Sequence, residues 1–88
     1  MERKVTICNK LGLHARAAAK FVTLASRFSS EIELIRDTKR VNGKSIMGVM
    51  MLAAAQGTEL LLSATGADEV EALDELEALI NNRFGEDE

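Results

Sequence analysis

The apolar residues of this chain follow two spacings, one typical of β-strands and one typical of α-helices, in short segments that succeed one another. Residues 31–34 alternate strictly between polar and apolar, which predicts a half-buried strand. From Ala15 to about Phe28, apolar residues recur every three or four positions, which predicts a helix with one buried face. The same reasoning predicts strands at 4–8, around 40–41 and at 58–65, and helices from 46 to about 55 and from Asp68 through Ile80.

Single residues mark where several of these elements should begin and end. Ser45 is a good N-cap for the middle helix, and Gly57 lies where a C-cap glycine would end it. Asp68 and Glu71 have a spacing like that of a capping box at the start of the last helix. The acidic tail, residues 85–88, follows the last apolar residue, and we expect it to fray.

The predicted order is strand, helix, strand, strand, helix, strand, helix, in a single domain of residues 1–88. Half-polar strands and amphipathic helices fit an α+β fold of two layers, with three helices on one face of a four-stranded, mainly antiparallel sheet. The apolar run 60–62 favours a central position for its strand. The pattern leaves the order of the strands in space open, and a ferredoxin-like sheet of a small-ligand-binding domain shares the first six elements.

The composition excludes several classes of function. One cysteine and one histidine form neither an internal disulfide nor an ordinary zinc site, so we expect no metal and no cofactor. The chain lacks Trp and Tyr and has a net charge of −3, which argues against a nucleic-acid partner. It has no apolar run long enough for a membrane span and no secretory leader, so we expect a cytoplasmic monomer that does not bind a membrane.

Charge is distributed unevenly along the chain. Residues 1–44 carry ten basic and four acidic side chains, a net +6, and residues 45–88 carry one basic and ten acidic side chains, a net −9. Such a field would steer an acidic partner or a phosphorylated group toward the basic half.

His14, the only histidine, stands at the mouth of the first predicted helix, after the turn-permissive Gly12. The free N–H groups and the positive dipole end of a helix bind anions, and the backbone amides of Arg16 and Ala17 are candidate donors. The Arg16 guanidinium adds a pair of parallel N–H donors for the same anion. Because a neutral imidazole is a good nucleophile, His14 and Arg16 are the predicted catalytic residues of a phosphoryl carrier. No acid lies near His14 in the sequence, which argues against hydrolysis.

A second candidate site begins at Ser45. The apolar residues after it follow one another too closely to fit one narrow buried stripe, so some of them should be exposed. Flexible methionine-rich surfaces adapt to partners, and the alternative is a fully packed helix. A phosphate on Ser45 would add about 1.5 to 2 negative charges beside these residues. The candidate docking patch consists of Ile46, Met47, Met50 and Met51.

Residues 12–16 followed by alanines, together with residues 44–47, resemble two motifs of the histidine-containing phosphocarrier (HPr) family of the bacterial phosphotransferase system. The resemblance extends over essentially the whole chain. It implies an open-faced two-layer fold and phosphorylation of the δ nitrogen of His14 by enzyme I, with phosphoenolpyruvate as the ultimate donor. It also implies transfer to an enzyme IIA protein, and a regulatory Ser45 whose partners would be a serine kinase and a phosphorylase.

Residues 9–11 and 78–84 look more like the nitrogen-related branch of this family (NPr) than the sugar-transport branch. One departure is Ala17, where most members have proline. Ala17 keeps an N–H donor but starts the helix less rigidly. A different class of function compatible with these residues is a regulatory interaction module that uses the His14 and Met47 surfaces.

Overall fold

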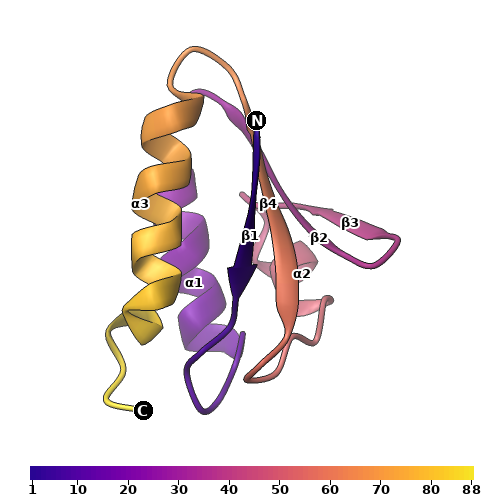
Figure 1. Ribbon diagram of the computed structural model, residues 1–88, viewed down its shortest axis with the longest axis vertical. Coiled ribbons are helices and arrows are strands. Elements are labelled where there is room, and N and C mark those ends of the chain that lie inside the picture. Colours follow the sequence, from indigo (N-terminus) through magenta and orange to yellow (C-terminus); the bar gives the residue numbers. More distant parts are fainter.

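The computed structural model describes residues 1–88 and contains the predicted elements in the predicted order (Figure 1). None of the helices has both the length and the apolar character that a membrane crossing requires. The strands are β1 (Glu2–Thr6), β2 (Glu31–Arg36), β3 (Lys39–Asn42) and β4 (Glu59–Thr65). The helices are α1 (Ala15–Ala25), α2 (Ile46–Met50) and α3 (Glu69–Asn81), followed by a 3₁₀ turn at Arg83–Gly85.

The four strands form one antiparallel sheet in the order β1-β4-β2-β3. Leu62 of β4 lies opposite Arg3 of β1 on one side and Leu34 of β2 on the other. The central position that the apolar run of β4 predicted is therefore confirmed. β1 lies at the edge of the sheet, whereas a ferredoxin-like sheet has its first strand in the interior, so that alternative is wrong.

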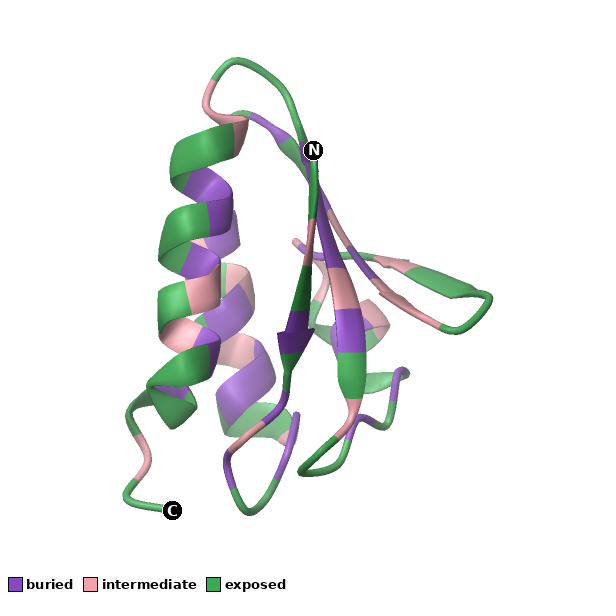
Figure 2. Ribbon diagram, in the orientation of Figure 1, coloured by how far each residue is buried: buried purple, intermediate pink, exposed green.

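The hydrophobic core lies on one face of the sheet, and α1 and α3 run side by side over it (Figures 1 and 2). Every helix contributes fully buried side chains, among them Phe21 of α1, Val49 of α2 and Leu73 of α3. Burial of one such side chain stabilises the fold by about 1.5–3 kcal/mol. On the other face Lys4 is exposed and Leu61 is only half-buried. The predicted two-layer α+β architecture is confirmed.

α2 ends earlier than the sequence predicted, at Met50. Basic side chains from the hairpin of β2 and β3 bind the carbonyl groups that follow it. Arg36 donates to the carbonyl oxygen of Leu52 at 2.8 Å, and Lys39 donates to that of Met51 at 3.2 Å. These side chains satisfy carbonyls that a longer helix would have used internally.

Two further boundaries differ from the prediction. α1 ends at Ala25, although the chain keeps turning and Phe28 stays buried. Gly57 does not end α2. It adopts φ +90° and its N–H donates to the carbonyl of Ile7 at 2.7 Å, so it turns the chain into β4.

Asp68 precedes α3 as predicted, but the predicted capping box is wrong. Its carboxylate caps no helix amide and instead accepts hydrogen bonds from the backbone N–H of Ser29 and from the N–H and hydroxyl of Ser30. The Ser30 hydroxyl, followed by the Ser29 amide, lowers the pKa of Asp68 from 3.8 to about 2. Asp68 therefore ties the loop after α1 to the start of α3.

We expect Asp68→Asn to lower the melting temperature at neutral pH, because the neutral amide binds these donors more weakly than the carboxylate. The pKa of Asp68 is lower in the folded state than in the unfolded state. The ionised carboxylate therefore stabilises the fold above pH 3.8, and this stabilisation is lost as the pH falls toward about 2. The melting temperatures of wild type and variant should therefore converge over that range in a thermal unfolding series. Glu71→Gln, at an exposed position of the same helix, is the matched control and should change little. A difference in melting temperature between wild type and Asp68→Asn that does not depend on pH would contradict this role.

Gly12 lets the loop before α1 approach the loop after α2. It adopts φ +69°, and a β-carbon there would stand 2.4 Å from the carbonyl oxygen of Ala54. The N–H of Leu13 donates to the same carbonyl at 2.9 Å. The approach of these two backbones fixes where the chain enters α1.

We expect Gly12→Ala to destabilise the fold more than Gly57→Ala. Gly57 also has a positive φ, but a β-carbon there meets nothing within 4 Å. Gly57→Ala should therefore cost only the backbone strain, about 1 kcal/mol, and Gly12→Ala at least about 1 kcal/mol more because the two loops must separate. Urea unfolding of both variants measures the difference. Equal losses would show that the contact with Ala54 is unimportant.

Candidate functional site

His14 is the N-cap of α1, as the sequence predicted. Its backbone is extended (φ −72°, ψ 177°), and its carbonyl accepts the first helical hydrogen bond, from Ala18, at 2.9 Å. The side chain folds back over the helix start, where ring nitrogen Nδ1 accepts a hydrogen bond from the backbone N–H of Arg16 at 3.3 Å. The ring is 28% exposed. A group in solvent can therefore reach the ring while the backbone fixes its orientation.

The first turn of α1 is an open positive end. It contains no acidic residue, and the N–H groups of Ala15 and Ala17 have no hydrogen-bond partner. The methyl group of Ala17 is buried in the core, which holds this turn in place. The Arg16 guanidinium forms no ion pair and is exposed. Both kinds of donor predicted for an anion are thus present beside the ring.

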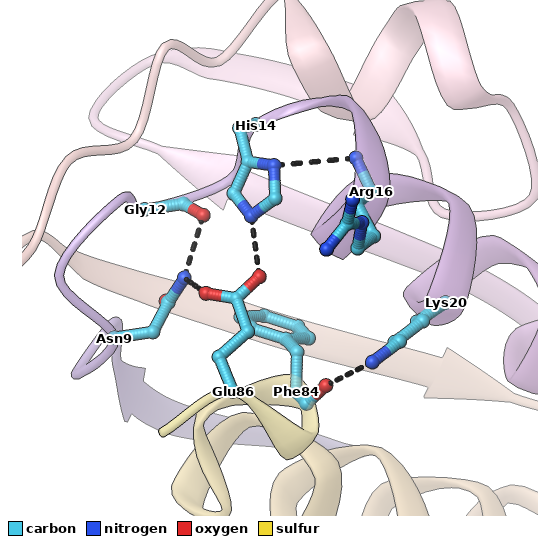
Figure 3. Close-up of polar contacts among 7 residues, drawn as sticks. All are labelled: Asn9, Gly12, His14, Arg16, Lys20, Phe84 and Glu86. Atoms are coloured by element: carbon cyan, nitrogen blue, oxygen red, sulfur yellow. Dashed lines mark hydrogen bonds and ion pairs between the residues drawn. The ribbon is translucent and has the colours of Figure 1, made fainter. Parts of the chain in front are cut away.

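The acidic tail does not fray but lies against His14 (Figure 3). One carboxylate oxygen of Glu86, Oε2, contacts ring nitrogen Nε2 of His14, and the other, Oε1, accepts a hydrogen bond from the Asn9 amide at 2.9 Å. The same amide donates to the carbonyl of Gly12 at 2.8 Å. Asn9 is fully buried, so it joins the tail to the loop that carries His14.

Several contacts hold this tail in place. The ring of Phe84 is fully buried, and its carbonyl accepts a hydrogen bond from Lys20 of α1 at 2.7 Å. The backbone N–H of Lys10 donates to the carbonyl of Glu88, and their side chains form an ion pair at 3.3 Å. The hydrogen bond from Asn9, and then the one from His14, lower the pKa of Glu86. Its carboxylate is therefore ionised over the whole neutral range.

Sequence reasoning missed Glu86 and Asn9 as members of the site. Glu86 lies 72 residues after His14, and no local pattern relates the two positions. The one relevant signal was Phe84, an apolar residue just before the tail that predicted where packing ends. An open hollow results, lined by Lys10, Leu11, His14, Ala15, Arg16, Glu86, Asp87 and Glu88.

The second candidate site has the predicted geometry at its start. Ser45 is the N-cap of α2, and its hydroxyl oxygen accepts a hydrogen bond from the N–H of Gly48 at 3.1 Å. Val49 is buried, but the four patch residues are exposed, with Met47 at 72% and Met51 at 61%. The alternative of a fully packed helix is therefore wrong. α2 packs against α1, so the patch belongs to the same helical layer as the start of α1.

The structure contains no cluster of three or more His, Cys, Asp or Glu side chains that would hold a metal ion. Cys8 is a free, half-buried cysteine whose thiol donates to the carbonyl of Ile80 at 3.2 Å. The groups available for chemistry beside His14 are therefore one imidazole, backbone amides, one guanidinium and the tail carboxylates. This set suits the binding and transfer of an anionic group.

Comparisons with known proteins find relatives over nearly the whole chain. Residues 1–82 match the family model described as PTS HPr component phosphorylation site. The chain is 56% identical over 88 residues to phosphocarrier protein HPr of Neisseria meningitidis, covering 100% of this chain and 99% of that protein.

Solved structures are similar over the same length. An HPr crystal structure from Thermoanaerobacter tengcongensis has a TM-score of 0.96 and 52% identity, covering 100% of this chain and 99% of that one. An HPr dimer from the same organism has a TM-score of 0.80 and 55% identity, with coverage of 93% and 94%. Similarity of this extent, over the whole fold, shows that the chain belongs to the HPr family, the phosphocarriers of the phosphotransferase system.

Proposed function

We propose that this chain is a monomeric, cytoplasmic phosphoryl carrier that accepts a phosphoryl group from enzyme I on Nδ1 of His14 and passes it to an enzyme IIA protein. The observation that carries the proposal is the placement of Nδ1 at the first turn of α1, where it accepts from the Arg16 N–H beside the unpaired N–H of Ala17. Membership of the HPr family supports the phosphocarrier role.

The geometry supports a simple transfer step. The Nδ1 lone pair attacks phosphorus, and the Arg16 N–H that it releases becomes a donor for a phosphoryl oxygen. The free N–H of Ala17 and the unpaired Arg16 guanidinium add further donors for the dianion. Glu86 lies at the other ring nitrogen and is bound to Asn9, so it is not placed to activate water for attack on phosphorus. We therefore favour a carrier over a phosphatase.

We further propose the exposed patch on α2 as the docking surface for both partners. Its members Ile46, Met47, Met50 and Met51 present flexible apolar area beside α1. Phosphorylation of Ser45 by a kinase would stabilise its own helix and place negative charge beside that area, which would repel an acidic partner.

Within the family we propose the nitrogen-related branch. Residues 9–11 and 78–84 support this choice. To test this assignment, the phosphorylated chain is mixed in separate reactions with a nitrogen-related enzyme IIA and with a sugar-specific one. We expect faster phosphoryl transfer to the nitrogen-related acceptor. Faster transfer to the sugar-specific acceptor would contradict the assignment.

We expect His14→Ala to abolish phosphorylation while the fold is retained, because His14 carries the only imidazole of the chain. Intact mass after incubation with phosphoenolpyruvate and enzyme I, kept at neutral or alkaline pH, measures the gain. Wild type and Ser45→Ala should each gain one acid-labile phosphoryl group. If the His14→Ala protein also gains an acid-labile phosphoryl group, His14 is not the phosphorylated residue. If wild type is not phosphorylated and His14→Ala still binds its partner with undiminished affinity, the regulatory interaction module is favoured instead.

We expect Met47→Ser to raise the KM for phosphorylation by enzyme I about tenfold and to leave the maximal rate nearly unchanged. Met47 is 72% exposed, so its loss removes docking area without disturbing the core. Val70→Ser, which removes an exposed apolar side chain on α3, is the control. If both variants change KM equally, α2 is not the docking surface.

A further inference from the structure

The hydrogen bonds of the His14 ring select one of its two neutral tautomers. The backbone N–H of Arg16 is a donor, so the Nδ1 atom that it contacts must offer a lone pair. The carboxylate of Glu86 is an acceptor, so the Nε2 atom that it contacts must carry the proton. Only the Nε2–H tautomer satisfies both contacts.

We propose that Glu86 is a positioning residue that keeps the proton on Nε2 of His14, so that the Nδ1 lone pair faces the helix mouth before and between transfers. This inference rests on the proposed carrier function and adds a residue from the C-terminal tail to it. Glu86 acts through the ring and not on phosphorus, because Nε2 and Nδ1 lie on different edges of the imidazole (Figure 3).

The carboxylate is held for this contact by groups from several parts of the fold. The buried Asn9 amide donates to Oε1 of Glu86 at 2.9 Å and leaves Oε2 for the ring. Phe84 is buried, and Lys20 binds its carbonyl, so the chain immediately before Glu86 is fixed to the core and to α1. Glu86 is itself only 16% exposed. These contacts therefore fix the position of the tail relative to His14.

The proton on Nε2 matters for both transfer steps. In the first, the Nδ1 lone pair forms the N–P bond, and the bond between phosphorus and the donor breaks, with its electron pair leaving on the donor. The Nε2 proton stays, so the phosphorylated ring is an imidazolium whose positive charge faces Glu86. In the second, the nucleophile of the acceptor bonds to phosphorus and the N–P electron pair returns to Nδ1. The ring then leaves as neutral imidazole, whereas loss of the Nε2 proton would make it leave as imidazolate, a much poorer leaving group.

The tautomer can be measured without any phosphorylation. Two-bond ¹H–¹⁵N correlation spectra of the ring, recorded where the imidazole is neutral, distinguish the protonated nitrogen from the bare one. We expect wild type to show the Nε2–H form, Glu86→Ala to show a mixture, and Glu86→Gln to lie between them because its amide oxygen still accepts a hydrogen bond. Glu75→Gln is the control, since it removes an exposed carboxylate of α3 that makes no hydrogen bond or ion pair and lies outside the hollow around His14.

The second readout is the single-turnover rate at which the phosphorylated proteins transfer to enzyme IIA. Loss of a charge-assisted hydrogen bond to the ring should slow this rate about tenfold in Glu86→Ala, less in Glu86→Gln and not in Glu75→Gln. Identical tautomer populations in wild type and Glu86→Ala would overturn the proposal, and so would a tautomer shift with an unchanged rate. If wild type accepts no phosphoryl group at all, the carrier function fails, and the spectra alone then decide whether Glu86 positions the ring.

Discussion

A single apolar face of the sheet has to be covered, and the arrangement of the rest of the chain depends on that requirement. β4 supplies the middle of this face, and α1 and α3 lie over it side by side. With all three helices in one layer, the loop before α1, the loop after α2 and the tail after α3 become neighbours. Contacts of Leu13 with Ala54, and of Asn9 with Glu86, join them. The site is built where three separate stretches of chain meet, so a small domain reaches a fixed geometry without a deep pocket.

The features that the sequence predicted are those set by local physics. Periodicity identified the strands and helices, and the helix-forming run after His14 placed the imidazole at an N-cap. The crowding of apolar residues after Ser45 correctly indicated an exposed surface. In each case the relevant neighbours lie within one or two helical turns along the chain, so the pattern itself carries the information.

The features that the sequence did not predict depend on side chains that find distant partners. Asp68 has the right spacing for a capping box but binds Ser29 and Ser30 instead, because the loop after α1 offers three donors at that place. Glu86 binds His14, which lies 72 residues before it in the chain. α2 stops early because Arg36, from another element, binds the carbonyls beyond it. Such choices are decided by the tertiary fold, which local patterns do not encode.

The basic half of the chain also offers less free charge than its composition suggests. The basic residues of 1–44 whose side chains have no protein partner are Lys4, Arg16 and Arg27. Arg16 lies in the first turn of α1 and Arg27 lies just after its end, and both line one open hollow along the helix. A hydrogen bond to a carbonyl leaves a cation its charge, so Lys20, which lines the same hollow, adds to a positive stripe along α1 that ends beside His14. Added salt would weaken the attraction of a distant acidic molecule to this stripe. The basic side chains already engaged with carboxylates or carbonyls are Arg3, Lys10, Lys20, Arg36, Lys39, Arg40 and Lys44.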